Sequence, residues 1–422
     1  ASAPATPGAW TGITYAPGSS GFLEGTTIEY AQHALTLNTT TPITVTNSTL
    51  RHNRHQTNNN PAYGSGLYIQ QGDHVIRNTH IYDNETSATG TGEVFGGGVY
   101  IASGSPKILN SWVYENSATG QAATSGGGIC VADGAALIQD SYILTNTVTG
   151  DTNGLKSGGG IAFVGTTDAI IRDSWIADNQ NDTTGGSCGG GGIGFIDNAT
   201  ASSIEGSVIH NNTLSCPGIG CEGAGIDMIG NNSITIVNNL IADNILERGS
   251  SGGLGGGVNM NNASSAGVHV INNTIVGNRA NQGGGIHMGN GDNNYVFNNN
   301  MFGNTASFRG GGLRVRSGTE DYNNAFNNTC PDGADYYNAT GTHNISKDPL
   351  FVNTGDLVRR YQLRQGSPLI DAGSDSATGR PYDDYDDTER PSGTSWDIGF
   401  DEVDPFVALK SVSLETASVG MS

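Results

Sequence analysis

The stretches Gly126-Gly127-Gly128-Ile129 and Ile143-Leu144-Thr145-Asn146 contain the two signatures that decide the fold. Glycine-rich blocks of the first kind recur about every thirty residues from Gly64 to Leu313, and such a period indicates stacked repeats. The second signature, an apolar residue with asparagine three positions later, follows most of these blocks. Its asparagines are Asn84, Asn116, Asn146, Asn179, Asn212, Asn244, Asn278 and Asn304.

The residues between the two signatures predict strands. Runs such as Val99-Tyr100-Ile101 and 107–113 are short, rich in apolar residues and bounded by Gly, Asn, Asp and Ser. No stretch keeps a sustained 3.6-residue apolar period, so we expect helices to be nearly absent. Stacking such units predicts an all-β fold, a single-stranded parallel β-helix in which each coil pairs only with its neighbours.

Glycine and asparagine suit the turns of such a stack. Glycine tolerates positive φ and close backbone approach, so the glycine blocks let one coil turn tightly against the next. Asparagine also tolerates left-handed conformations, and its amide can bond its own turn. We therefore expect the repeated asparagines to form an amide ladder along the solenoid. A further polar column, interrupted by Gly206, is also expected at turns and comprises Asn78, Asn110, Asp140, Asp173, Asn238, Asn272 and Asn298.

The repeat divides the chain into four parts. Residues 1–21 form an N-terminal extension, 22–347 the β-helix, 348–404 a loop-rich cap and 405–422 a tail strand. The tail is expected to add as a strand to a neighbouring subunit, whereas a resemblance described below implies the first strand of a β-sandwich that was removed. Its candidate assembly residues are Val407, Leu409, Val412 and Leu414.

Composition excludes some partners and suggests a compartment. The formal net charge of −21 would repel nucleic acid phosphates and anionic lipids. No apolar run approaches the length of a membrane span. The opening residues 1–5, Ala-Ser-Ala-Pro-Ala, resemble the end left by signal-peptide removal, so we expect an extracellular or cell-surface protein.

The cysteines allow a disulfide. Cys216 and Cys221 flank a short loop, and in an oxidising compartment we expect them to pair, with Cys188 as a competing partner one coil earlier. The total of five leaves at least one thiol unpaired or intermolecular, and the pairing of Cys130 and Cys330 is open. Without a Cys-x-x-Cys motif, a zinc or redox centre has little support.

Asn-x-Ser/Thr sequons mark glycosylation candidates, although a chain so rich in Asn, Ser and Thr also produces them by chance. The candidates are Asn47, Asn84, Asn181, Asn198 and Asn262.

The repeated Gly-Gly-Gly-Ile and Ile-x-x-Asn motifs resemble those of the chlamydial polymorphic outer-membrane proteins and, more broadly, the pectate-lyase-type right-handed β-helices of bacterial surface proteins. This resemblance implies the fold but no reaction, because the scaffold carries adhesins, lyases, hydrolases and structural proteins. The segments 348–351, 366–373 and 397–402 are similar to the end of the choice-of-anchor Q family. That similarity implies a surface-associated protein whose cap closes the β-helix. Residues 407–413 resemble the first strand of a bacterial surface β-sandwich repeat.

The residue after each glycine–apolar block is expected to point outward. In later coils this column reads Asp227, Asn259, His287 and Arg314. Such a row on successive coils could bind a sugar acid or perform general acid–base chemistry, although a solvated face would also be polar. If the protein is an enzyme, Asp227, His287 and Arg314 are the candidate catalytic residues.

The densest acidic segment lies in the cap. Closely spaced oxygen ligands suit Ca²⁺, the only cofactor that we expect, although the spacing lacks the features of an EF-hand and an acidic surface loop would look the same. The candidate ligands are Asp383, Asp384, Asp386, Asp387, Glu389 and Asp397.

Two classes of function follow. The favoured one is a secreted structural protein of the cell surface or extracellular matrix, which self-associates or binds other surface proteins and assembles into filaments or a sheath through its tail and helix ends. The alternatives are a polysaccharide lyase or glycoside hydrolase acting on extracellular glycans, and an adhesin. The scarcity of cations disfavours a lyase for acidic sugars.

Overall fold

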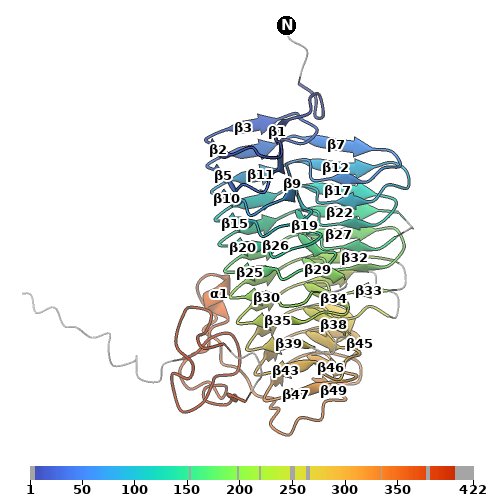
Figure 1. Ribbon diagram of the computed structural model, residues 1–422. Coiled ribbons are helices and arrows are strands. Elements are labelled where there is room, and N and C mark those ends of the chain that lie inside the picture. The colour runs from blue at the N-terminus through green and yellow to red at the C-terminus, as the bar shows by residue number, and fades with distance from the viewer. Residues whose placement is uncertain are drawn as a thin grey trace, which may run out of the picture.

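The computed structural model describes residues 5–151, 154–196, 199–217, 220–247, 252–262, 267–333, 335–376 and 381–403. Its coils stack along one axis as a parallel β-helix (Figure 1), which confirms the predicted all-β fold class. Within the described residues the only α-helix is α1 (Leu357–Arg360), which lies in the cap. Also within these residues, no helix is both long and apolar enough for a membrane crossing.

Three long sheets form the walls of the β-helix, and neighbouring strands within them run parallel. The first sheet comprises β1 (Ile13–Tyr15), β4 (Leu35–Asn38), β9 (Leu67–Gln71), β14 (Val99–Ile101), β19 (Ile129–Val131), β24 (Ile161–Phe163), β29 (Ile193–Ile196), β34 (Ile226–Gly230), β38 (Val258–Asn262), β42 (Ile286–Met288), β46 (Leu313–Val315) and β49 (Tyr336–Tyr337). The second comprises β2 (Gly21–Glu24), β5 (Ile43–Thr46), β10 (Val75–Arg77), β15 (Lys107–Leu109), β20 (Leu137–Gln139), β25 (Ile170–Arg172), β30 (Ser202–Glu205), β35 (Ile234–Val237), β39 (Val268–Ile271), β43 (Tyr295–Phe297) and β47 (Thr319–Asp321). The third comprises β3 (Thr27–Glu29), β6 (Thr49–Arg51), β11 (His80–Tyr82), β16 (Trp112–Tyr114), β21 (Tyr142–Leu144), β26 (Trp175–Ala177), β31 (Val208–His210), β36 (Leu240–Ala242), β40 (Thr274–Val276), β44 (Asn300–Phe302) and β48 (Asn324–Phe326).

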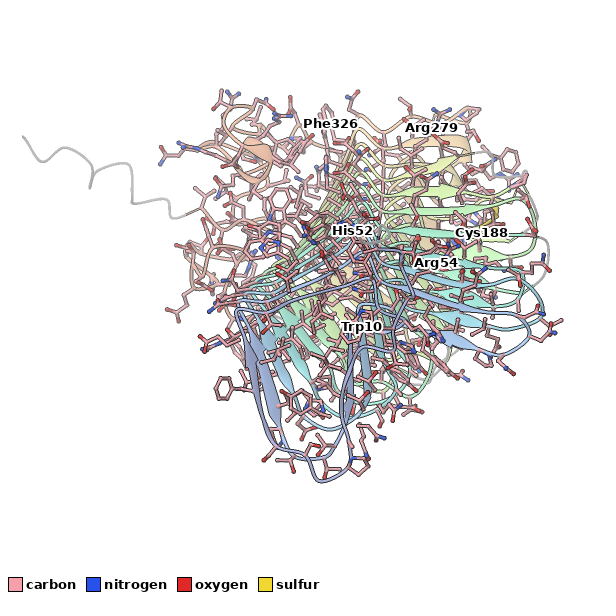
Figure 2. The ribbon with its side chains drawn as sticks, turned by 90° about the horizontal axis from the view of Figure 1, so that it is seen from above. Trp10, His52, Arg54, Cys188, Arg279 and Phe326 are labelled. Carbon is pink, nitrogen blue, oxygen red and sulfur yellow. A yellow bond between two sulfur atoms is a disulfide. The ribbon has the colours of Figure 1, made fainter. Side chains whose placement is uncertain are left out.

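Two smaller sheets, which we call the arm, project from one side of the coils (Figures 1 and 2). The nine-stranded sheet of the arm comprises β7 (Arg54–Thr57), β12 (Glu85–Ala88), β17 (Ser117–Gly120), β22 (Thr147–Gly150), β27 (Gln180–Thr183), β32 (Thr213–Ser215), β37 (Ile245–Glu247), β41 (Arg279–Gln282) and β45 (Thr305–Arg309). The six-stranded sheet comprises β8 (Ala62–Tyr63), β13 (Val94–Phe95), β18 (Thr124–Ser125), β23 (Lys156–Ser157), β28 (Cys188–Gly189) and β33 (Cys221–Glu222). A full coil therefore has up to five strands.

The main core lies inside the coils and repeats with them. Ile143, Ile176 and Ile209 occupy register-equivalent positions of successive strands, and each is 0% exposed. Alternation along a strand sends every second side chain inward. The arm has a separate apolar interior, which contains Ala118 and Val148 near one end and Leu214 and Leu246 further along.

The eight asparagines of the second signature form one continuous ladder inside the turns. Each donates through Nδ2 to Oδ1 of the asparagine in the next coil, at 2.9–3.0 Å. The ladder extends one rung beyond the predicted set at each end, to Asn53 and Asn328, and terminates on the Asp335 carboxylate. Because both Nδ2 and Oδ1 of the side-chain amide are used on every rung, the ladder ties each coil to the next.

A second buried ladder was not predicted from the sequence. In the early coils serine hydroxyls accept from the backbone of the preceding coil, as in the bond from Ser111 N to Ser141 Oγ. From Asn239 onward asparagines take over, and Asn239 Nδ2 donates to Asn273 Oδ1 at 3.0 Å. The members directly follow the predicted polar turn column, whose residues have the expected positive φ, for example 55° at Asn238.

The β-helix begins earlier than predicted. Strand β1 lies within the segment 1–21 assigned to an extension, yet it pairs in parallel with β4 as a member of the first sheet. The predicted assembly residues Val407, Leu409, Val412 and Leu414 lie outside the described residues.

The cap packs along the flank of the later coils instead of closing the end of the β-helix (Figure 1), which corrects the expected placement. Phe400 of the cap packs on Leu240 and Val276 of the third sheet. Side chains of the polar turn column hold the cap backbone, since Asn272 Nδ2 donates to Asp397 O at 3.0 Å and Asn298 Nδ2 to Ser374 O at 2.8 Å.

Candidate functional site

A groove follows the junction between the outer face of the first sheet and the arm. Its upper part, about 370 Å³, is lined by residues that include Phe95, Tyr100 and Val164. Its lower part, about 540 Å³, is lined by residues that include Glu222 and Asn261. Leu155 lines both parts, so the two parts adjoin each other along this junction.

Aromatic side chains gather at the upper end of the groove. The ring centroids of Tyr63 and Tyr100 lie 4.8 Å apart, and those of Tyr63 and Tyr68 lie 5.3 Å apart, both with stacked planes. Phe95 also stacks on Tyr63, with centroids at 6.1 Å. Tyr63, Tyr68 and Phe95 are half-buried, so this cluster offers apolar ring surface together with two phenolic hydroxyls.

A hydrogen-bonded polar row lies behind the lower end. Asn259 Nδ2 donates to Asp227 Oδ1 at 2.8 Å and to Glu222 Oε2 at 2.9 Å. His287 Nδ1 lies 2.7 Å from Asn259 Oδ1, and Arg314 Nη1 lies 2.6 Å from His287 Nε2. Because a guanidinium only donates, His287 Nε2 must accept and its proton must be on Nδ1. The structure thus brings together Asp227, His287 and Arg314, the three residues proposed for an enzyme.

The row is covered by the arm, which corrects the expectation that this column faces solvent. Asp227 is 1% exposed, and Asn259 and His287 are 0% exposed. Gly189 of β28 packs directly over Asp227, so that a Cβ at Gly189 would collide with the carboxylate. The Glu222 side chain is half-buried and lines the groove, so it is the member of this network that a bound molecule can reach.

Burial sets the protonation states of the row. Burial first, and then the charge of Glu222, raises the pKa of Asp227 well above its ordinary value. Burial, with the guanidinium groups of Arg314 and Arg316, lowers the pKa of His287 to about 3. His287 is therefore neutral near pH 7, in agreement with its hydrogen bonds, and does not supply an imidazolium acid.

Asp227→Asn is expected to change the pH dependence of stability. A carboxyl whose folded pKa is raised contributes stability at low pH and loses that contribution as pH rises through the folded pKa. The variant should therefore match the wild type near pH 4 and exceed it at pH 8 by about 1–3 kcal/mol of unfolding free energy. Urea unfolding at several pH values measures this difference. Asp182→Asn, at an exposed position of the arm, is the matched control, and parallel pH profiles for the two variants would contradict the assignment.

The candidate calcium ligands do not form one cluster. Asp384 and Asp386 come together, and their partner is Asp401, which was not predicted; carboxylate oxygens of the three lie within 4.8 Å of one another. Asp397 lies apart, where its carboxylate accepts from the backbone of Asp371 at 2.7 Å and Val403 at 2.8 Å. Three other candidates, Asp383, Asp387 and Glu389, are exposed.

Buried carboxyls in the cap have raised pKa values. Burial raises the pKa of Asp384 to about 8, with a side-chain hydrogen bond from the protonated Asp384 to Asp386 as the next cause. Burial also raises the pKa of Asp397 and of Asp401 to about 7 each. A second concave surface of about 770 Å³ lies where the exposed part of this acidic loop faces the coils, between residues such as Tyr382 and Glu205.

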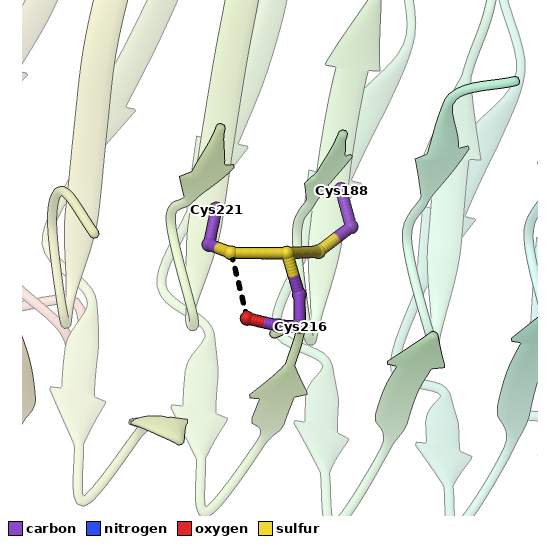
Figure 3. A group of neighbouring side chains, drawn as sticks. All are labelled: Cys188, Cys216 and Cys221. Carbon is purple, nitrogen blue, oxygen red and sulfur yellow. Dashed lines mark hydrogen bonds between the residues drawn. A yellow bond between two sulfur atoms is a disulfide. The ribbon is translucent and has the colours of Figure 1, made fainter. Parts of the chain in front are cut away.

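Three cysteines meet in the interior of the arm (Figure 3). The Sγ atom of Cys216 lies at bonding distance from those of both Cys221, the expected partner, and Cys188, its competitor. The repeat had placed Cys188 one coil before the other two as a competing partner, and the register of β28 and β33 makes it a direct neighbour of Cys221, so all three meet. Cys130 is buried elsewhere, against Tyr100, and Cys330 lies in a partly exposed turn.

The sequons divide by burial. Asn84 is a rung of the ladder and is 1% exposed, while Asn181 is 0% exposed and donates to Lys156 O and Gly189 O. The folded protein does not present these two amides to a glycosyltransferase, so both predictions were wrong. Asn47 is exposed at a turn. Asn198 and the side chain of Asn262 lie outside the described residues.

Comparisons with known proteins address the fold. Residues 7–159 match the family model described as "Right handed beta helix region". No curated protein matches the sequence. Among solved structures, the "Crystal structure of pectate lyase Pel9A" is similar with 16% sequence identity and a TM-score of 0.49, over 92% of this chain and 88% of that chain. The family match and the stacked coils identify the fold as a right-handed parallel β-helix.

Proposed function

We propose that the protein is an extracellular surface protein that binds a neutral polysaccharide in the groove beside the arm. The observation that carries this proposal is that the two adjoining parts of the groove follow successive coils, from an aromatic upper end to the Glu222 carboxylate and the Asn261 amide below. Recognition sites combine apolar surface with a few well-placed polar groups, and a sugar polymer presents both to its receptor.

The dimensions favour a polymer over a small sugar. One lining residue comes from each of six successive coils: Tyr100, Ala132, Val164, Ile196, Ile229 and Asn261. Five steps between coils, each about 4.8 Å, give a length on the order of 25 Å. Several consecutive sugar units fit within this length.

The charge of the groove favours a neutral ligand. Glu93, Asp133 and Glu222 line it, and the described lining residues include no Lys or Arg. With a formal net charge of −21, the chain would repel a polyuronate.

The burial of Asp227 disfavours cleavage by the catalytic residues that the sequence suggested. A glycoside hydrolase uses two carboxyl groups that flank the scissile bond. Here Glu222 reaches the groove, whereas Asp227 is covered by β28.

Val164→Arg tests the groove directly. The side chain is half-buried at the groove wall, so arginine should obstruct the ligand without disturbing the core. We expect calorimetric binding to one or more neutral polysaccharides to weaken at least about tenfold, or 1.4 kcal/mol. Tyr382→Arg, in the concave surface beside the cap, is the matched control and should bind normally. Tighter binding of pectin or alginate than of neutral polysaccharides would refute the proposal. An equal loss of affinity in both variants would refute it as well. If the protein released new reducing ends from a polysaccharide and His287→Ala abolished this release, the enzyme alternative would be established instead.

We further propose that Ca²⁺ binds between Asp384, Asp386 and Asp401. Their three carboxylates fit part of the six to eight oxygen ligands that the ion takes, and solvent can complete the set beside the exposed Asp386. Millimolar CaCl₂ is expected to raise the thermal midpoint of the cap. The corresponding gain in unfolding free energy is about 1 kcal/mol or more if the ion concentration is well above its Kd. Asp386→Asn should remove this increase, whereas Asp375→Asn should retain it. An identical calcium effect in both variants would exclude the site.

Self-assembly is a second proposed function. Because the cap lies beside the later coils (Figure 1), the end of the stack is formed by the segment after β49, which bonds β47 and β48 through Gly341 and Ile345, and in this proposal it is the surface for end-to-end association. In this proposal the tail 405–422 contributes the contact. Size-exclusion chromatography and electron microscopy of the full chain should show larger particles than a chain that ends at Glu402. Identical monomers would count against assembly through the tail.

A further inference from the structure

The three cysteines inside the arm come from both of its sheets. Cys188 and Cys221 are register partners on the adjacent strands β28 and β33. Cys216 directly follows β32 of the opposite sheet, and Figure 3 shows its sulfur between the other two. All three are at most 1% exposed, and their sulfur atoms lie within 4.8 Å of one another.

A disulfide can join only two of these three cysteines. A sulfur atom in a disulfide has one sulfur partner, so Cys216 can pair with Cys188 or with Cys221 but not with both. Either pairing leaves the third sulfur buried against the bond. A metal ion instead uses all three sulfur atoms as thiolate ligands. The spacing Cys216-x₄-Cys221 also lies within the range typical of paired metal ligands, and Cys188 supplies a third ligand from a distant segment.

The surroundings suit a soft metal ion. The walls of the pocket are apolar, with Leu214, Ala224 and Leu246 packed around the sulfur atoms. Thiolates buried in such a pocket require nearby positive charge. Lys156 is buried at the register position next to Cys188, on β23, and donates to Ala122 O at 2.5 Å. The charge of a divalent ion offsets two of the three thiolates, and the Lys156 ammonium group, bonded on the Ala122 side of β23, adds positive charge one coil away.

We propose that Cys188, Cys216 and Cys221 bind one thiophilic d¹⁰ metal ion, Zn²⁺ or Cu⁺, within the arm. Thiolate ligands select these ions over Mg²⁺ and Ca²⁺. The ion cross-links the two sheets of the arm near the lower part of the groove, which Ser187 and Gly220, the neighbours of two ligands, also line. This assignment is independent of glycan binding.

Metal titration of the full chain tests the site. The protein is purified under reducing, oxygen-free conditions, and its metal content is measured by mass spectrometry. After metal removal, Co²⁺ serves as the probe, because thiolate coordination gives intense charge-transfer absorption. We expect one Co²⁺ per chain, displaced by one equivalent of Zn²⁺ or Cu⁺, and the relative affinities identify the preferred ion. Cys216→Ser and Cys188→Ser should each weaken binding by roughly 10–100-fold or more.

Cys330→Ser is the matched control, because it removes a cysteine outside the cluster and should leave metal binding unchanged. Circular dichroism monitors the fold of every variant. A natively folded, reduced chain without Co²⁺ absorption would overturn the proposal. So would a reduced chain that loses its β-spectrum and regains it only when a disulfide re-forms, since the cluster would then be a structural disulfide. Equal metal binding by Cys330→Ser, Cys216→Ser and Cys188→Ser would overturn it as well.

Discussion

Asn212→Ala is expected to lower the free energy of unfolding by about 3–6 kcal/mol, because it interrupts the asparagine ladder near its middle. Asn212 Nδ2 donates to Ile176 O at 2.8 Å and to Asn244 Oδ1 at 3.0 Å. Its Oδ1 accepts from both the backbone and the side chain of Asn179, at 3.1 and 3.0 Å. Alanine leaves these buried groups without partners, and each orphaned group costs about 1–3 kcal/mol.

Equilibrium unfolding in urea, followed by circular dichroism, measures this loss. The neighbouring residue provides a close control, because Asn211 is exposed and has φ of 52°. Asn211→Gly keeps the left-handed turn and removes only a bond to the exposed side chain of Asp178, so we expect a change below about 1 kcal/mol. Similar losses in the two variants would show that the ladder does not hold the coils together.

The coils and the ladder could be predicted because the sequence repeats them. An asparagine such as Asn146 performs the same task in every coil, so its recurrence with glycine-rich blocks identifies both the stack and the column. The second ladder escaped prediction because its residue type changes along the chain, from Ser207 to Asn239. A signal was present, however, since these residues directly follow the polar turn column that the sequence did reveal.

The arm and the groove could not be predicted in the same way. Alternation correctly indicated that Asp227 and His287 point away from the main core, but it does not say whether another sheet covers them. The short strand β28 provides that cover over Asp227, and it is only two residues long. Strands this short carry no periodic pattern, so the burial of the polar row depends on tertiary packing alone.

The cap shows a further limit of sequence reasoning. A run of acidic residues suggested one calcium site, yet the structure separates Asp397 from Asp384 and supplies Asp401 instead. The order of residues within a loop does not determine which carboxylates meet. Asp401 lies in the segment 397–402 that carried the resemblance to an anchor-type ending, and this segment was the available signal.

Arg390→Met is expected to detach the cap from the coils. Arg390 Nη1 lies 2.7 Å from Glu402 Oε2, and both side chains are 0% exposed. The guanidinium also donates to Gly399 O at 3.1 Å, in the segment that packs on the third sheet. Removal of one partner of a buried ion pair costs about 3–5 kcal/mol, because the remaining charge is buried without compensation. Fluorescence of Trp396, which is 3% exposed in the native cap, reports the resulting loss of packing during urea titration.

The double variant Arg390→Met/Glu402→Met separates the cost of an unpaired buried charge from the cost of losing the packing and hydrogen bonds of the arginine side chain. If the uncompensated Glu402 carboxylate causes the damage, replacing it with a second apolar side chain should recover much of the 3–5 kcal/mol. Arg172→Met provides the surface comparison, because the Arg172–Glu205 pair is partly exposed and should contribute only about 0–1 kcal/mol. A double variant no more stable than Arg390→Met would mean that the hydrogen bonds to the backbone, rather than the ion pair, hold the cap. If Arg172→Met and Arg390→Met lowered the free energy of unfolding equally, the buried pair would have no special role in holding the cap.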